Sequence, residues 1–306
     1  MRSINNFKML LATVIGGLVF IISVASAHGN SEKTGALLWK ISGNGLNHPS
    51  YIFGTHHLFP ASFLDSVAGV KLAFAESRQM IGEVAMQDMM ALAGELQQAG
   101  MMPQDSTWQM LLSEDDYRFV DEQLTAFFGV GLQAFLASKP AMVGMNYSVM
   151  FYMRTFPGIN PAESIDLWFQ QQAFGRDISV IGLETVHDQI DALFLMSLKQ
   201  QAEDLLCTLK NTEHTVSSMH KLNRIYRSAD LSAMAAMLRE ESPCPMSAEQ
   251  EKAINNERNR RWLEKLPALM ADKPSFIAVG ALHLAGEAGI LTGLERLGYT
   301  VEAVIE

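Results

Sequence analysis

The sequence lacks the short motifs of several common enzyme classes. It contains no G-x-S-x-G segment of the α/β-hydrolase type, no H-E-x-x-H segment of the ordinary zinc peptidases and no glycine-rich phosphate-binding loop. Lysine and arginine are also few, 23 against 33 acidic residues, and they form no basic cluster that dominates a region. An acidic chain of this kind is a poor candidate for binding nucleic acid or an anionic lipid surface.

Cysteine is scarce as well, because only Cys207 and Cys244 occur. Two distant cysteines without other ligands nearby make a poor metal site. Both lie near the ends of a segment that we predict to be a helical hairpin, and an exported protein meets an oxidising compartment. We therefore expect a disulfide that closes this hairpin, with two buried free thiols as the alternative.

The first residues have the pattern of a targeting segment. Residues 9–24 form an uncharged apolar run that follows Arg2 and Lys8 and ends at Ala25-Ser26-Ala27. Signal peptidase recognises small residues spaced in this way, so we expect residues 1–27 to be a signal peptide cleaved after Ala27. Residues 28–306 would then be a single periplasmic or secreted domain. A retained membrane anchor is the alternative, although the run is short for a span of about 20 residues.

Beyond this segment the pattern predicts an α/β protein. Strand-like runs occur at residues 36–41, 50–53, 79–84, 178–183, 275–279 and 299–305. The first two runs are joined by a turn-rich linker and should form a hairpin. Amphipathic periodicity predicts helices at residues 63–76, 186–210, 247–270 and 287–297. Two long helical stretches, about 86–175 and 185–272, lie between the two ends of the chain.

Those two ends share one pattern. Gly54 is followed three residues later by His57, and Gly280 by His283, each directly after an apolar run. In both places a helix and a further strand follow, which is the size of a βαβ unit with parallel strands. We therefore expect a central mixed sheet built from two split strand-GxxH-helix-strand half-repeats, with the helical stretches as a large insertion that covers the site.

Acidic residues also follow predicted strands. Glu83 and Glu184 stand at such ends, where ligands of open α/β sheets gather. Two histidines with one or two glutamates make a plausible site for Mn, Co, Zn or Fe, and a metal-bound water is a nucleophile for hydrolysis. Arg258, followed by Asn259, is a candidate for stabilising an oxyanion. Each feature alone also has a structural explanation, since a histidine after a strand is more often a structural side chain.

Taken together, these positions resemble the TraB/PrgY/GumN family, the superfamily that includes the TIKI metalloproteases. The resemblance lies in the order and rough spacing of several motifs along nearly all of the chain after the signal segment. These are Gly54-Thr55-His56-His57, the acidic strand end at Glu83, Asp166, the G-L-E-T segment at residues 182–185 with Gln189, Tyr226 with Asp230, Arg258-Asn259 before Trp262, and Gly280-Ala281-Leu282-His283 followed by Leu284, Gly286 and Gly289.

The resemblance implies an α/β fold with two G-x-x-H halves and, in the TIKI branch, divalent-cation-dependent proteolysis. Two departures bear on the metal ligands. A second histidine, His56, stands where the family usually has a small or apolar residue, so His56 and His57 both remain candidates. The segment at Glu83 also lacks the additional acid often found there.

We therefore expect an exported, metal-dependent hydrolase that cleaves peptide bonds in a peptide or protein substrate. His57 or His56, with Glu83 and His283, would bind the metal. Glu83, Glu184, Arg258 and Asn259 would act in catalysis. Two alternatives remain at this stage. One is a non-catalytic protein that binds and sequesters a peptide, as the pheromone-inhibitory members of the family suggest, and the other is a hydrolase of small esters or amides. Contact with a membrane is expected only through an uncleaved signal segment.

Overall fold

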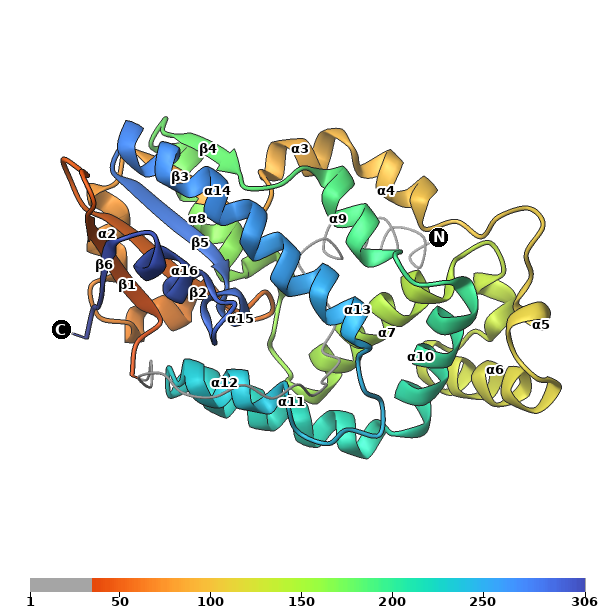
Figure 1. Ribbon diagram of the computed structural model, residues 1–306. Helices are drawn as coiled ribbons and strands as arrows, with labels where there is room; N and C mark the ends of the chain where they lie inside the picture. Colours follow the sequence, from red (N-terminus) through yellow and green to blue (C-terminus); the bar gives the residue numbers. More distant parts are fainter. Residues whose placement is uncertain (1–34, 306) are drawn as a thin grey trace.

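The computed structural model describes residues 35–305, which are built on a six-stranded mixed sheet (Figure 1). The strands lie in the order β4-β3-β5-β2-β1-β6. In chain order they are β1 (Leu38–Gly43), β2 (Ser50–Thr55), β3 (Gln79–Gly82), β4 (Ser179–Gly182), β5 (Ser275–Gly280) and β6 (Tyr299–Ala303). The expected α/β class is confirmed. The expected signal peptide, its cleavage site and the alternative anchor lie outside the described residues.

The two strands that carry the G-x-x-H motifs are direct neighbours. β2 and β5 pair in parallel, with Thr55 opposite Gly280, and β3 and β4 continue the parallel arrangement on the other side of β5. β1 pairs antiparallel with β2, which confirms the expected hairpin, and β6 pairs antiparallel with β1 at the edge of the sheet. The carboxyl ends of four parallel strands therefore meet at one edge of the sheet.

Helices make up most of the remaining chain. They are α2 (Val70–Glu76), α3 (Met86–Ala91), α4 (Ala93–Ala99), α5 (Trp108–Leu111), α6 (Glu114–Phe128), α7 (Pro140–Thr155), α8 (Ile165–Gly175), α9 (Val186–Leu193), α10 (Leu198–Lys210), α11 (Thr212–Arg227), α12 (Leu231–Met237), α13 (Ala248–Glu251), α14 (Glu257–Asp272), α15 (Ala281–Leu284) and α16 (Ile290–Arg296). In Figure 1 helices α4 to α7, α9 to α11 and α13 extend beyond the sheet as a separate helical region, whereas α8 lies against the sheet.

Helices pack on both faces of the sheet. On one face, Phe74 of α2 and Phe169 of α8 place their rings 5.3 Å and 4.6 Å from the ring of Phe276 on β5. α14 crosses the other face, in front of the sheet in Figure 1, and buries Trp262. A strand covered on both faces has no polar side, which explains why β5 is buried at every residue. The last part of each long helical stretch thus belongs to the layers of the sheet.

Several predicted helices are divided in the structure. The single helix expected at residues 63–76 is wrong, because a 3-10 helix, η2 (Ala61–Ser66), is separated from α2 by Gly69, which has a φ of +69°. Leu72, an apolar residue of this segment, is 64% exposed. The helix expected at residues 186–210 is divided as well, because Ser197 accepts a hydrogen bond from the Gln200 N–H and begins α10 anew.

The helix expected at residues 247–270 contains an irregular turn. α13 passes into a π-helix, η5 (Lys252–Asn256), before α14 begins at Glu257. A π turn inserts one extra residue into the helix and changes the direction of the side chains that follow, and such turns are frequent at functional sites. Sequence periodicity does not reveal this insertion, because the apolar residues on either side still fit a helix.

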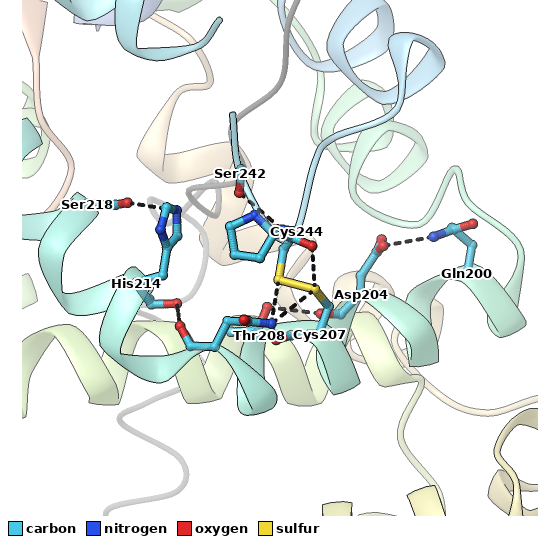
Figure 2. The surroundings of a disulfide bond; sticks show 11 residues. Gln200, Asp204, Cys207, Thr208, His214, Ser218, Ser242 and Cys244 are labelled. Carbon is cyan, nitrogen blue, oxygen red and sulfur yellow. Dashed lines mark hydrogen bonds between the residues drawn. A yellow bond between two sulfur atoms is a disulfide. The ribbon is translucent and has the colours of Figure 1, made fainter. Parts of the chain in front are cut away.

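Cys207 on α10 forms a disulfide with Cys244, in the segment between α12 and α13, as expected (Figure 2). The bond attaches this segment to the helical region. In Figure 2 the segment passes close to α10 and α11, with Ser242 and Cys244 facing Thr208 and His214. Within residues 35–305 no helix is long and apolar enough to cross a membrane.

Candidate functional site

The candidate residues come together at the carboxyl ends of the parallel strands. His57 follows β2, Glu83 follows β3, Glu184 follows β4 and His283 follows β5 on the short helix α15. Parallel pairing brings these four ends side by side, although their positions span more than half of the chain. The two G-x-x-H motifs therefore lie at one shared site, as their spacing suggests.

Arg258 lies at the centre of this group and is completely buried. Its Nε donates to Glu184 Oε2 at 2.9 Å, and Nη2 donates to Glu184 Oε1 and to Glu83 Oε2, each at 2.6 Å. Nη1 donates to the Ile254 carbonyl oxygen at 3.0 Å and to His283 Nε2 at 3.1 Å. A guanidinium has five N–H donors, and all five are used by partners within the chain.

His283 is held from two sides. Because Arg258 donates to its Nε2, the ring carries its proton on Nδ1, which donates to Asn259 Oδ1 at 2.7 Å. Asn259 Nδ2 in turn donates to the carbonyl oxygens of His283 and Ala288. Burial, followed by the charge of Arg258, lowers the pKa of His283 to about 3, so the imidazole is neutral. Asn259 therefore fixes both the tautomer of His283 and the loop that carries it.

His57 is oriented by Asp166, at the start of α8. Its Nδ1 donates to Asp166 Oδ2 at 3.1 Å, and Thr55 Oγ1 donates to the other oxygen at 2.6 Å. Its Nε2 lies 3.8 Å from Glu83 Oε1. Burial lowers the pKa of His57, but Asp166 and then Glu83 outweigh burial and raise it to about 9. The structure thus places one protonated and one neutral imidazole on either side of Glu83.

Glu83 remains ionised in this environment. Burial alone would raise its pKa, but Arg258, followed by His283 and His57, holds the pKa of this carboxyl well below its usual range. The Gly280 N–H also donates to Glu83 Oε1 at 2.8 Å. Arg258 carries the counter-charge, and the two nearby glutamates keep its pKa above the ordinary value although burial opposes this.

The two motif glycines are required for different structural reasons. A Cβ at Gly280 would lie 3.3 Å from Glu83 Oε1 and 3.5 Å from both His57 Nε2 and His283 Cδ2, so any side chain there would enter the space between the three groups. A Cβ at Gly54 would lie 3.0 Å from Ala281 and from Leu284, which pack against β2. Gly280 therefore keeps the site open, whereas Gly54 allows the close approach of α15.

His56 and His57 point into different surroundings. The His56 ring lies 4.7 Å from the ring of Phe59 and 5.3 Å from that of Tyr226, and its Nδ1 accepts the Leu58 N–H at 3.3 Å. Burial, followed by the charge of His57, lowers the pKa of His56 to about 3. Of the two histidines, His57 is the one whose imidazole lies beside Glu83.

The expected metal ligands His57, Glu83 and His283 lie close together in this arrangement. Imidazole and carboxylate groups suit a divalent cation, and His57 Nε2 and His283 Nε2 lie 3.8 Å and 4.0 Å from Glu83 Oε1. However, His283 Nε2 and Glu83 Oε2 both accept hydrogen bonds from Arg258. Across residues 35–305, no group of three or more His, Cys, Asp or Glu side chains is arranged to hold a metal ion. In this arrangement the side chains do not fit a metal, because a cation would have to displace the guanidinium.

Two residues of the site could not be assigned a role from the sequence alone. Asp166 belongs to the family pattern, yet only the structure places its carboxylate against His57. Thr55 precedes the histidine pair and orients Asp166 through its hydroxyl group. The threonine in the G-T-x-H motif was the one available signal for this contact. The expected roles of Glu83, Glu184, Arg258 and Asn259 in catalysis stay predictions.

A cavity of about 190 Å³ opens beside the cluster. Thr55, His57, Gly280 and His283 line one part of it, and most of the remaining lining comes from α7, α10, α11, α12, α13, η5 and the segment between α12 and α13. A ligand in this cavity can therefore contact the cluster through His57, which is partly exposed, and through the buried ring of His283 that lines the cavity wall.

Fold and site together define an α/β protein with a buried, charged cluster at the carboxyl ends of four parallel strands. The chain belongs to the TraB/PrgY/gumN family, whose sequence model matches residues 37–303. This match confirms the resemblance drawn from the motifs and covers the whole sheet and the helical region. Neither a comparison with curated proteins nor one with solved structures gave a match.

Proposed function

We propose that the protein is an exported hydrolase that cleaves peptide bonds, with His57, Glu83 and His283 at its reaction centre. One observation carries the proposal. The His57 imidazole is anchored at Nδ1 by Asp166 while its Nε2 lies 3.8 Å from Glu83 Oε1, beside a cavity. A positioned imidazole next to a carboxylate is a common arrangement for proton transfer to or from a reacting group.

The surrounding residues support this role by holding the reacting groups in place. His57 Nε2 and Glu83 Oε1 are farther apart than a hydrogen bond allows. The two groups therefore do not bond each other, and each stays available for proton transfer with a substrate. Arg258 holds Glu83 and His283, and Asn259 holds His283. Groups fixed before the substrate binds need little reorganisation during the reaction. Glu184 and Asn259 are positioning residues in this proposal, because they act through Arg258 and His283.

Export is part of the proposal, and dependence on a divalent cation is tested separately. The apolar run at residues 9–24 and the Cys207–Cys244 disulfide support export into an oxidising compartment. Donor chemistry and family membership support a divalent cation, which when bound would lower the pKa of a water molecule. The hydrogen bonds of Arg258 to Glu83 and His283 argue against it, so the steps above use side chains of the chain alone.

The test is cleavage of a peptide library by the purified protein, read by mass spectrometry. The protein is assayed with a chelator and then with Mn, Co, Zn or Fe added singly. We expect cleavage that His57→Ala and His283→Ala each abolish. His187→Ala is the matched control, since His187 is exposed on α9 and pairs only with Glu95 among the described ion pairs. Cleavage that survives in both site variants would contradict the proposal. A higher cleavage rate after metal addition than with the chelator would show that the activity depends on a divalent cation.

A peptide-binding protein without catalysis is the second candidate. It is favoured by one observation, namely that all five N–H groups of Arg258 already have partners, so none is free to stabilise an oxyanion. Peptides recovered intact after long incubation, but bound to the wild-type protein and not to His57→Ala, would support it. A parallel panel of small esters and amides tests the remaining possibility of a hydrolase for such compounds.

A further inference from the structure

The cavity beside the cluster has a strongly apolar wall. Histidine, serine and threonine side chains contribute to its lining, but most of its surface comes from aliphatic and aromatic side chains in separate parts of the chain. They include Leu58, Val149, Tyr152, Met219, Leu222 and Met234. Within the described part of the chain, Glu251 is the only acidic residue of the lining, and no lysine or arginine lines it. Burying a charged side chain in such surroundings is costly, so the wall favours an uncharged ligand group.

The size of the cavity suits a single large side chain. A cavity of about 150 Å³ in another protein holds one benzene molecule, and this cavity measures about 190 Å³. A second cavity of about 100 Å³ lies next to it, and the two share Ser148, Thr208, Met246 and Ile254. A ligand that occupies both would have to be extended.

One polar atom in the wall needs a partner. The Oδ1 atom of Asn255 is buried and accepts no hydrogen bond from any residue in the range 35–305. Asn255 lies on the π-helix η5 and lines the cavity. A buried acceptor without a donor costs free energy, and a turn of the Asn255 amide that presents Oδ1 to a ligand N–H would remove that cost. An acyl chain could fill the same apolar space but offers no donor, whereas a peptide offers an apolar side chain and a backbone N–H.

We propose that the cavity is a subsite for an uncharged, apolar side chain of a peptide, and that Asn255 Oδ1 accepts a backbone N–H of that peptide. The proposal rests on the proposed function only for the choice of a peptide as ligand. It makes Asn255 and the apolar wall responsible for selecting the segment that reaches His57. Peptide binding, unlike cleavage, tests it directly.

The side-chain preference is tested with peptides that differ at one position, which carries Leu, Phe, Met, Glu or Lys in turn. Their affinities for the full chain are measured by calorimetry. We expect the apolar peptides to bind at least about tenfold more tightly than the charged ones. Met246→Lys places a charge in the wall and should remove this preference. Met90→Lys is the matched control, because Met90 is 73% exposed on α3 and does not line the cavity.

The role of Asn255 is tested by combining a protein variant with a peptide variant. Methylation of single backbone nitrogens along the peptide should weaken binding about tenfold at one position. In Asn255→Leu the unmodified peptide should bind about tenfold more weakly, and methylation at that position should have no further effect. Asn256→Leu is the control, since Asn256 lies on the same π turn but does not line the cavity.

The outcomes separate this inference from the proposed function. Apolar selection that depends on Asn255, with peptides recovered intact, supports the subsite and contradicts hydrolysis. Cleavage with no preference between Leu and Glu overturns the subsite and leaves hydrolysis standing. Equal binding of charged and apolar peptides, no peptide binding at all, or binding of dodecanoate in place of peptides would also overturn it.

Discussion

Arg258 donates a hydrogen bond to His283 across 3.1 Å in the interior of the protein. This contact links the motif at the end of β5 to α14 on the face of the sheet. The same guanidinium bonds Glu83 and Glu184, so one side chain connects the ends of three parallel strands. The charged cluster is thus a structural unit as well as a candidate reaction centre, and the two roles can be separated by substitution.

Replacing Arg258 by leucine should destabilise the protein strongly. The change leaves two buried carboxylates without their counter-charge, which typically costs about 3–5 kcal/mol. Urea unfolding measures the free energy. Arg260→Leu is the matched control on the same helix, because Arg260 is exposed and its pairs with Glu257 and Glu264 are worth less than about 1 kcal/mol. Equal stability of the two variants would show that the network contributes little.

Gly280→Ala should impair function with little loss of stability. The new Cβ would lie 3.3 Å from Glu83 Oε1, which must give way by a few tenths of an ångström, and it would fill the space next to His57 Nε2, 3.5 Å away. A displacement of about 1 Å can cost about a hundredfold in rate, so the smaller shift expected here should lower the rate by less than about a hundredfold. Peptide cleavage and thermal unfolding are measured together. Gly94→Ala, in α4, meets no atom within 4 Å and should stabilise by about 0.5–1 kcal/mol at unchanged activity. Full activity of Gly280→Ala would disprove the close packing at the site.

Removing the disulfide should lower the free energy of unfolding by about 4 kcal/mol. The bond joins residues 37 positions apart, and without it the unfolded chain regains the entropy of the open loop. The double variant Cys207→Ala with Cys244→Ala tests this in urea. Because Cys244 lines the cavity, peptide affinity should fall as well. A reducing agent should produce the same loss in the wild-type protein and none in the double variant. An effect of reduction on the double variant would mean that the reductant acts elsewhere.

Acid should destabilise the protein partly through His56. Its pKa falls from an ordinary value near 6.5 to about 3 in the folded state, so the unfolded chain binds the proton first. Stability contributed by the neutral ring is complete above about pH 6.5 and decreases as the pH falls towards 3. In His56→Asn, which retains an acceptor for the Leu58 N–H, the slope of stability against pH should be smaller by up to about 1.4 kcal/mol per pH unit.

The measurement is urea unfolding at intervals between pH 4 and pH 7. His283, whose pKa is also lowered to about 3, contributes equally in both proteins and cancels in the difference. His187→Asn provides the comparison for an exposed histidine. Parallel curves for the wild-type protein and His56→Asn would show that His56 does not remain neutral in the folded state.

Much of the fold can be predicted from the sequence because strands buried on both faces are local apolar runs. β5 ends at its motif glycine, Gly280, and β2 ends at Thr55, one residue after Gly54, and the expected hairpin of β1 with β2 forms. Helix ends were less predictable. Gly69 and Ser197 interrupt helices whose apolar periodicity continues across them, and the π turn of η5 leaves no periodic signal.

The sequence by itself determined which chemical groups stand at the strand ends and which family the chain resembles, since both depend on residue order. Only the tertiary structure decided how these groups are paired. His56 and His57 are adjacent in the chain, yet one packs against Tyr226 and the other bonds Asp166. Likewise, Arg258 reaches Glu83 across 175 positions of sequence. Partners so far apart are selected by the packing of sheet and helices, which no local pattern of residues encodes.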